Sequence, residues 1–216
     1  MLAKNQRNAA ATRVLRAALV MVWITAIVVG ARTLLIYENT PAEAAEAASR
    51  WPSHTSLARS NHEFTLVLFV HPNCPCTRAS IAELELIMAQ LQGRLRAFAV
   101  FDKPASSEAE VKASSLWPMT SLIPGVSSVY DSDGVETKRF GGKVSGQTML
   151  YGPDGKLVFC GGLTSSRGHQ GYNEGAAAVV RLVRAGASET AQAPVFGCSL
   201  FNPTAKTLRE DRLWKQ

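Results

Sequence analysis

The sequence predicts an α/β fold in which helices cover the faces of a mixed β-sheet. Residues 64–70 (FTLVLFV) form a short, continuous apolar run with β-branched and aromatic members, which is typical of a buried strand. Apolar residues then recur at helical spacing over residues 81–91, and a second strand-like run covers residues 94–101. Two more strand-like runs and a short helical stretch follow within residues 147–186. The expected order is therefore β-α-β, then α-β, then β-β-α.

The predicted elements have recognisable ends. Gly93 is expected to stop the first helix, and Gly186 stands where the C-cap of the last helix is expected. The pattern in residues 103–122 predicts a loop and a helix, and residues 126–134 predict a short strand that ends in a turn. Residues 147–162 contain Gly-Pro-Asp-Gly between two strand-like runs, which is a strong signal for a β-hairpin.

The composition is that of a globular protein, with 46% hydrophobic and 19% charged residues in a chain of 216. The formal net charge is +6, but residues 1–16 carry four basic and no acidic residues, which leaves a net charge of only +2 for the rest. This placement is typical of a targeting signal, and the sequence has no basic stripe with interleaved aromatics. We therefore expect no nucleic-acid partner.

An apolar segment follows the basic N-terminus. Residues 17–37 (AALVMVWITAIVVGARTLLIY) are long enough to cross a bilayer if Arg32 extends toward the headgroups. Because positive charge precedes the segment, we expect a single-pass anchor in the inner membrane, with the C-terminal domain in the periplasm or outside the cell. A cleaved signal peptide is the alternative, with small residues such as Ala42 and Ala44 near the cleavage point. Both alternatives export the rest of the chain.

The expected organisation has five parts. They are a basic cytoplasmic N-terminus (residues 1–16), the anchor (17–37), a linker (38–60), the α/β domain (61–200) and a C-terminal tail (201–216). The linker is rich in Ala, Glu, Ser and Pro, and its residues 42–50 could be partly helical.

Two of the four cysteines stand one residue apart, in the sequence NCPC, between the first predicted strand and the first predicted helix. With Pro75 as the first helical residue, Cys74 is the N-cap, where unpaired backbone N–H groups and the helix dipole stabilise a thiolate. Arg78 and His71 would add positive charge. Cys74 is therefore predicted to be a partly exposed nucleophile of low pKa, with Cys76 as its partner.

A disulfide between Cys74 and Cys76 is predicted to be labile. Side chains two residues apart in a helix point to nearly opposite sides, so such a bridge would be strained and easily reduced. In an exported chain with few other cysteines, a labile pair of this kind is typical of thiol–disulfide exchange. The alternative is that both are ordinary cysteines of a turn.

These features resemble the thioredoxin-like superfamily, in which a strand leads into a cysteine motif at the start of a helix. The sequence is more similar to the membrane-anchored, RedB-type thioredoxin-like proteins of bacteria. The resemblance spans about residues 64–200, and the segments that carry it are HPNCPCTRAS, IPGV, DSDGVETKRFGGKVSG, SRGHQG and VFGCSL. It implies a thioredoxin-like sheet and thiol chemistry centred on Cys74.

Two positions depart from the thioredoxin pattern. Thr77 falls where the second thioredoxin cysteine would be, so Cys76 resolves a mixed disulfide only if the turn is shifted. Gly146 stands where most thioredoxins have a cis-proline that faces the cysteine, shapes substrate docking and keeps metal away from the dithiol. The second departure makes metal binding at the dithiol easier to expect.

Further residues are candidates for auxiliary roles. Cys198 could fold back as a resolving thiol or a regulatory clamp, or it could be a free cysteine of the tail. Cys160 ends an apolar strand and is expected to be a small buried hydrophobe, with pairing to Cys198 as the alternative. His169 shares a Gly-flanked loop with Arg167 and could shuttle protons or bind a metal, or it could be solvated. His71 could tune the nucleophile or simply end a strand.

Three functions fit these patterns. The favoured one is an exported thiol–disulfide oxidoreductase in which Cys74 attacks a protein disulfide, Cys76 or else Cys198 resolves the intermediate, and no cofactor or metal is needed. The second is a Cu(I)-binding or copper-delivery protein, since two thiolates near His71 or His169 suit Cu(I). The third is a non-enzymatic, tethered domain that binds a partner.

Overall fold

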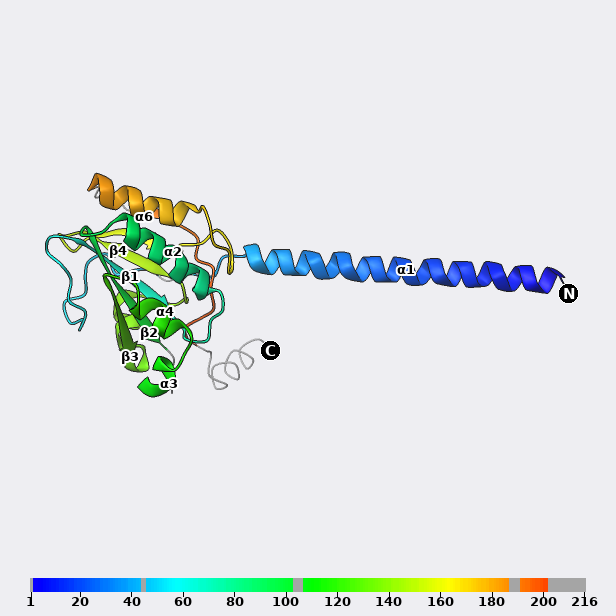
Figure 1. Ribbon diagram of the computed structural model, residues 1–216, viewed down its shortest axis with the longest axis horizontal. Coiled ribbons are helices and arrows are strands. Elements are labelled where there is room, and N and C mark those ends of the chain that lie inside the picture. The colour runs from blue at the N-terminus through cyan, green and yellow to red at the C-terminus, as the bar shows by residue number, and fades with distance from the viewer. Residues whose placement is uncertain (1, 44–45, 103–106, 187–190, 202–216) are drawn as a thin grey trace, which may run out of the picture. The chain divides into compact units, whose positions relative to one another are not determined.

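The computed structural model describes residues 2–43, 46–102, 107–186 and 191–201, with side chains described from residue 13 onward. The chain divides into two compact units, Met1–Thr40 and Pro41–Gln216. The first unit is a single helix, α1 (Leu2–Asn39), drawn in blue in Figure 1. Its part Arg13–Asn39 is long and apolar enough to cross a membrane, as residues 17–37 predicted, and a signal sequence has the same properties.

The second unit is built on a six-stranded sheet (Figure 1). Its strands are β1 (Phe64–Val70), β2 (Leu95–Asp102), β3 (Val126–Asp131), β4 (Thr148–Tyr151), β5 (Leu157–Gly161) and β6 (Ala191–Gln192). They lie in the order β3-β2-β1-β4-β5-β6. β1 and β3 are parallel to β2, whereas β4 pairs antiparallel with both β1 and β5, and β6 is parallel to β5.

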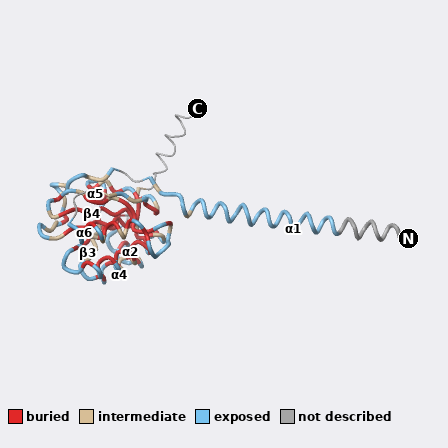
Figure 2. The backbone as a smooth tube through the Cα atoms, turned by 90° about the horizontal axis from the view of Figure 1, so that it is seen from above, coloured by how far each residue is buried: buried red, intermediate tan, exposed pale blue. Residues whose placement is uncertain are grey.

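Helices and loops cover both faces of this sheet. The helices are α2 (Thr77–Gln90), α3 (Glu108–Lys112), α4 (Leu116–Ser121), a 3₁₀ turn (Ser132–Gly134), α5 (Val135–Phe140) and α6 (Glu174–Ala185). Apolar residues of α2, α4 and α6 share one core cluster with the strands, and α5 packs in a second cluster with Leu57 and Leu200. Figure 2 shows the buried strands inside the domain, surrounded by exposed loops and helix faces.

β1 lies at the centre of the sheet, and all seven of its residues are buried. Leu66 and Leu68 belong to the cluster that contains α2 and α6, while Val67 and Phe69 belong to the cluster that contains α5. Because alternate side chains of a strand point to opposite faces, a strand covered on both faces needs an unbroken apolar run. The continuous run in the sequence is explained by this position.

The predicted fold class is confirmed. The β1-α2-β2 unit and the β4-β5-α6 unit meet through the antiparallel pair β1/β4, which is the arrangement of a thioredoxin-like sheet. The hairpin and the last helix lie where the sequence predicted them, and Gly186 takes up a left-handed conformation (φ 64°) at the C-cap of α6.

The expectation of a loose linker over residues 38–60 is wrong for residues 46–60, which pack on the domain. The Ala48 N–H donates to the Phe140 carbonyl at 3.0 Å, and the Trp51 ring lies 5.0 Å from the Phe140 ring. Leu57 is buried. No helix is present in the described part of residues 42–50. The prediction rested on the average composition of the segment, which is that of a linker. Its few apolar side chains are nevertheless enough to attach residues 46–60 to the domain.

Three elements were not expected from the sequence. α3 and α4 are two short helices where one was predicted. α5 directly follows the turn predicted at the end of residues 126–134, and it is stabilised because Asp131 accepts the N–H groups of Glu136 and Thr137 at 2.9 and 2.7 Å. β6 is only two residues long. Most of the expected tail, residues 202–216, lies outside the described residues.

Candidate active site

The candidate active site lies where β1 ends and α2 begins. Beyond Val70, the Cys74 N–H donates to the His71 carbonyl at 3.0 Å. A tight turn follows, in which the Thr77 N–H donates to the Cys74 carbonyl at 3.3 Å. α2 begins at Thr77, with Cys76 at the N-cap. The prediction of Cys74 as the N-cap is therefore wrong by two residues, because this tighter turn replaces the first turn of the helix.

Two cysteines that are far apart in the sequence meet at this turn. The sulfur of Cys74 lies 3.0 Å from the sulfur of Cys198, and both thiols are free. Cys74 is buried, with 1% of its surface exposed, whereas Cys198 is partly exposed. The Cys160 sulfur lies on β5, 3.9 Å from the amide nitrogen of Gln147. Cys198 therefore faces Cys74, and the alternative pairing with Cys160 is not the one present.

Cys198 is held in place by residues 193–201, which we call the C-terminal strap. The Ser145 N–H, in the loop before β4, donates to the Cys198 carbonyl at 2.8 Å, and the Leu200 N–H donates to the same loop at 2.9 Å. A Cβ atom on Gly197 would lie 1.7 Å from the Ser145 carbonyl oxygen. Only glycine therefore allows the strap to approach the loop this closely.

The surroundings of Cys74 stabilise its thiolate. Burial raises the pKa of Cys74, but hydrogen bonds from the side chains and backbone N–H groups of Thr77 and Cys198 outweigh burial and bring the pKa below its ordinary value. The pKa of Cys198 is instead raised to about 12, first by burial and then by the hydrogen bond to Cys74 and its negative charge. With Cys74 ionised, the proton between the two sulfurs is therefore on Cys198.

Buried hydroxyl groups lead to the Cys74 sulfur. The His71 N–H donates to Ser145 Oγ at 2.8 Å, and that oxygen lies 2.6 Å from the Thr77 hydroxyl oxygen. Ser145 and Thr77 are both fully buried. When the Ser145 hydroxyl donates to Thr77, the Thr77 hydroxyl proton can point at the thiolate. Sequence reasoning found Thr77 only as the position of a missing cysteine and did not find Ser145, because the contact depends on the fold.

Cys76, the predicted partner of Cys74, is partly exposed. Burial first, and then the negative charge of Cys74 and a hydrogen bond to its side chain, raise the pKa of Cys76, while the Arg167 guanidinium opposes this shift. Arg167 also donates to the Gly197 carbonyl in the strap. Arg167 therefore connects the loop after β5 to both Cys76 and the strap. From the sequence alone, a functional role was predicted for His169 in this loop, and none was predicted for Arg167.

The side-chain contacts of Arg78 and His169 are with groups other than the two sulfurs. The Arg78 guanidinium lies 3.1 Å from Ser115 Oγ, near the start of α4, and Arg78 is not among the groups that shift the pKa of Cys74. His169 is exposed, and its Nδ1 lies 3.0 Å from the Arg167 carbonyl oxygen. The roles predicted for these two side chains stay predictions.

His71 and Gly146 lie beside the site. Besides its backbone contacts, His71 accepts the Asn73 N–H on Nδ1 at 3.2 Å. Gly146 has a φ of +92°, and its N–H donates to the Phe69 carbonyl at 2.8 Å. A Cβ atom on Gly146 would lie 3.1 Å from Ser80 Oγ, so the backbone passes close to α2. None of the peptide bonds in the described ranges is cis.

The predicted metal alternative has two soft donors at this site. Cys74 and Cys198 present sulfurs of the kind that suits Cu(I). Among the described residues, no group of three or more His, Cys, Asp or Glu side chains is arranged to hold a metal ion. Copper binding therefore stays a prediction that rests on the two thiols.

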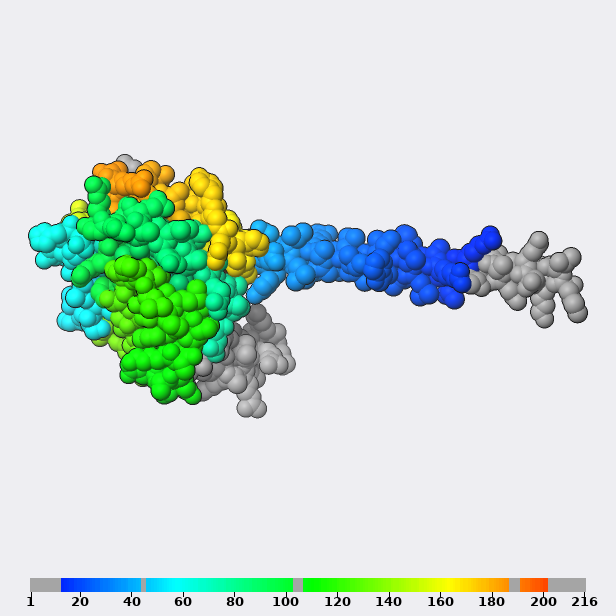
Figure 3. Space-filling view, viewed as in Figure 1, coloured from blue at the N-terminus to red at the C-terminus, as the bar shows by residue number. Residues whose placement is uncertain are grey.

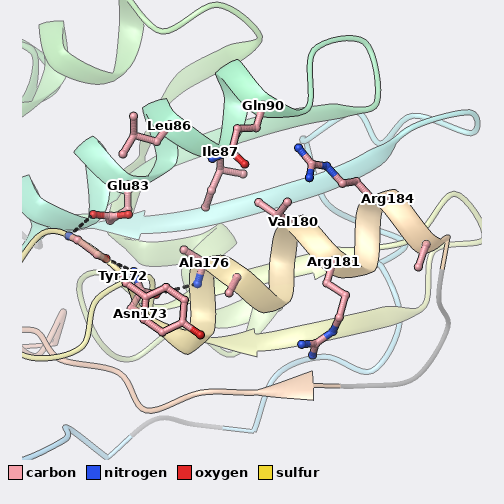
Figure 4. Close-up of a pocket in the computed structure, with 13 residues that line it drawn as sticks. Glu83, Leu86, Ile87, Gln90, Tyr172, Asn173, Ala176, Val180, Arg181 and Arg184 are labelled. Atoms are coloured by element: carbon pink, nitrogen blue, oxygen red, sulfur yellow. Dashed lines mark hydrogen bonds between the residues drawn. The ribbon is translucent and has the colours of Figure 1, made fainter.

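A separate groove of about 850 Å³ lies between α2 and α6, which are side by side on the surface in Figure 3. Figure 4 shows Leu86 and Val180 along the groove and Glu83 at one end. Glu83 is buried and accepts the Gly171 N–H at 2.7 Å, which fixes the loop carrying Arg167 to α2. None of the four cysteines lines this groove.

No family model and no curated protein matches the sequence. A hypothetical protein of Sinorhizobium meliloti 1021 has a similar structure, with a TM-score of 0.54, 17% identity, and coverage of 76% of this chain and 96% of that one. An uncharacterized conserved protein of Geobacillus kaustophilus gives a TM-score of 0.55 at 17% identity, with 77% and 95% covered. The exposed lipoprotein thioredoxin of Streptococcus pneumoniae TIGR4 gives 0.44 at 17% identity, with 58% and 86% covered. At these identities the likeness to the first two structures shows a shared fold alone.

Proposed function

We propose that the protein is a membrane-anchored thiol–disulfide oxidoreductase whose nucleophile is Cys74. The observation that carries this proposal is the 3.0 Å contact between the sulfurs of Cys74 and Cys198, in surroundings that lower the pKa of Cys74. The thiolate is the species that attacks a disulfide, and a second thiol in contact with it can complete the exchange. The partners expected for this chemistry are protein thiols and disulfides.

The proposed reaction has two steps. The Cys74 thiolate attacks one sulfur of a partner disulfide, forms a mixed disulfide and releases the other sulfur as a thiolate. A second thiol of this chain then gives its proton to solvent or to the released thiolate, attacks the Cys74 sulfur and releases the partner. The partner gains two electrons and this chain loses two, so an external dithiol has to reduce the chain again.

The proposed place of the reaction is the exported side of a membrane. α1 is long and apolar enough to serve as an anchor, and four basic residues precede its apolar part. This charge distribution favours an inner-membrane, single-pass protein with its C-terminal domain in the periplasm. The narrower assignment to the RedB-type proteins of bacteria belongs to the same proposal and rests on the sequence motifs alone.

Cys74→Ser in the full-length protein, kept in detergent, tests the proposal. Reduced wild-type protein is mixed with a self-quenched fluorescent peptide that contains a disulfide, and fluorescence measures its cleavage. We expect Cys74→Ser to abolish the cleavage by the protein, since a hydroxyl does not attack a disulfide at neutral pH. Cys160→Ala removes a partly exposed cysteine that lies on β5 and is the matched control with unchanged cleavage.

Cleavage that persists in Cys74→Ser would contradict the proposal. In that case the two remaining predictions separate by one further measurement, in which the metal-free, reduced wild-type protein competes with a chelator for Cu(I). Retention of Cu(I) would favour the copper-binding alternative, since two thiolates are suitable ligands. Loss of Cu(I) to the chelator would favour a non-enzymatic binding domain.

A further inference from the structure

We propose that Cys198, and not Cys76, is the resolving thiol, so that each reduction of a partner leaves a disulfide between Cys74 and Cys198. This inference rests on the proposed function and identifies the second thiol in it. Cys198 lies 124 residues after Cys74 in the sequence, yet the strap places the two sulfurs 3.0 Å apart. A disulfide bond is about 2.05 Å long, so the sulfurs need to approach by only about 1 Å.

The backbone around Cys76 is less suited to this bond. Cys76 has helical φ and ψ angles (−64° and −33°), and the turn is closed by hydrogen bonds from Thr77 to Cys74 and from Ala79 to Cys76. The charge of Cys74 and a hydrogen bond to its side chain both act on Cys76, so these two thiols are also close. A bond between them would nevertheless have to form within a helical turn, where side chains two residues apart point in different directions. A Cys74–Cys76 bond would therefore require this turn to open, whereas a Cys74–Cys198 bond leaves it intact.

The C-terminal strap keeps Cys198 facing Cys74 through contacts with parts of the fold outside α2. Ser145 donates its N–H to the Cys198 carbonyl, and Arg167 donates to the carbonyl of Gly197, the residue before Cys198. Val195 and Phe196 are buried and attach the strap to the domain. These contacts keep Cys198 over Cys74 without a covalent bond, which gives it a high effective concentration as an attacking group.

The electrostatics of the pair favour the correct order of events. While Cys74 is a thiolate, burial first, and then the hydrogen bond to Cys74 and its charge, raise the pKa of Cys198, so Cys198 keeps its proton and does not compete for the substrate disulfide. When Cys74 becomes part of a mixed disulfide, it no longer carries this charge, and Cys198 can lose its proton more easily. The Arg167 guanidinium then favours the Cys198 thiolate. Cys198 is thus activated by the step that precedes its own.

The resolving step exchanges the mixed disulfide for a disulfide within the chain. The Cys198 thiolate attacks the Cys74 sulfur, the bond between Cys74 and the partner breaks, and the partner leaves as a thiolate. The same geometry gives the strap a second role, because Cys74 is only 1% exposed while the strap is in place. The strap must therefore move aside to admit a protein disulfide, and it returns to complete the reaction.

Disulfide mapping on the full-length wild-type protein in detergent tests the inference without any variant. The metal-free protein is equilibrated with a series of dithiothreitol redox buffers, alkylated, digested and analysed by mass spectrometry. We expect a peptide pair joined through Cys74 and Cys198 to form under oxidising conditions and to disappear under reducing ones. A pair joined through Cys74 and Cys76 in its place would overturn the inference and leave the proposed function standing.

A trapping experiment distinguishes the two thiols in the reaction itself. With the fluorescent disulfide peptide, Cys198→Ser should accumulate a mixed disulfide on Cys74 and release it at least about 100-fold more slowly, because an intramolecular thiol has been lost. Cys76→Ser should release it about as fast as the wild type. Trapping by Cys76→Ser and not by Cys198→Ser would overturn the inference. If no variant and no wild-type sample forms a mixed disulfide on Cys74, the proposed function fails, and the inference fails with it.

Discussion

The Thr77 hydroxyl is one of the buried groups that stabilise the Cys74 thiolate. Its hydroxyl lowers the pKa of Cys74 and lies 2.6 Å from the Ser145 hydroxyl, away from water. Thr77→Val keeps the shape of the side chain and removes the hydroxyl. Because a hydrogen bond to a charged group contributes about 1.5–3 kcal/mol, we expect the pKa of Cys74 to rise by about one to two units. The pH dependence of Cys74 alkylation, followed by peptide mass spectrometry, measures this shift.

Thr120→Val is the matched control for this prediction. Thr120 is also fully buried, but its hydroxyl lies 2.6 Å from the Ser128 hydroxyl on β3 and bonds to carbonyls of α4. Removing it should leave the pKa of Cys74 unchanged. An unchanged pKa in Thr77→Val would contradict the prediction and would show that the backbone and Cys198 alone stabilise the thiolate.

Asp102, the last residue of β2, is a buried carboxyl group that the thiol chemistry does not use. It is fully buried, and neither of its oxygens has a hydrogen-bond partner among the residues that the structure describes. Burial first, and then the negative charge of Asp131, raise the pKa of Asp102 to about 6. At neutral pH most of the group is therefore ionised without a partner, which lowers the stability of the folded state.

We expect Asp102→Asn to stabilise the domain at pH 8 and to change its stability little at pH 4. The folded state binds this proton more tightly than the unfolded chain, so the stability due to the protonated group is present below pH 3.8 and is lost as the pH rises through about 6. The shift from 3.8 to about 6 corresponds to a difference of about 2–3 kcal/mol between pH 4 and pH 8. Urea unfolding of the full-length protein and the variant, at both pH values, measures the difference. Glu85→Gln, at an exposed carboxyl group of α2, is the control, and an equal gain at both pH values in Asp102→Asn would contradict the prediction.

At the scale of elements, the position of the strap depends on the missing side chain of Gly197. Gly197→Ala would place a Cβ atom 1.7 Å from the Ser145 carbonyl oxygen, so the strap has to move away from the loop before β4. We expect Cys74 to become more exposed and its alkylation at a fixed pH to become several-fold faster. The disulfide between Cys74 and Cys198 should also form less readily in the redox buffers, because the two sulfurs are no longer in contact.

Ser199→Ala is the control in the same strap. Ser199 is exposed, and its hydroxyl donates to the Phe201 carbonyl without touching the loop before β4. Its substitution should leave both the alkylation rate and the disulfide unchanged. Equal alkylation rates in Gly197→Ala and in the wild type would show that the strap tolerates the added methyl group and does not cover Cys74 in solution.

The sequence predicted those elements whose burial produces a recognisable pattern of apolar residues along the chain. β1 was found because both its faces are covered, which requires the unbroken run of residues 64–70. α5 was not found, because it is held by side-chain contacts with Asp131 that no local pattern shows. Cys74 was found from its place between a strand and a helix, whereas the contact with Cys198 depends on where the strap returns after α6. Long-range contacts of this kind follow from the fold and cannot be read from spacing.

At the scale of the whole molecule, the chain combines an α/β domain with a helix whose apolar side chains are largely exposed. Apolar side chains of α1 such as Leu19, Trp23 and Ile27 are 49–65% exposed. A helix with apolar residues on every side needs an apolar environment, which a bilayer supplies. Under the proposed function, the anchor would keep the nucleophile at the membrane surface, where exported substrate proteins pass.

We expect the full-length protein to have its C-terminal domain on the exported side of the membrane and to keep α1. Alkaline phosphatase fused after Gln216 should be active in intact bacterial cells, because it folds with its disulfides only outside the cytoplasm. Replacing Lys4, Arg7, Arg13 and Arg16 with Gln should reduce this activity, because the positive charges that retain the N-terminus in the cytoplasm are lost. Replacing the C-terminal basic residues Lys206, Arg209 and Arg212 with Gln is the control without effect. An inactive wild-type fusion would contradict export, and a membrane-free product that lacks α1 in its mass spectrum would show a cleaved signal peptide in place of the anchor.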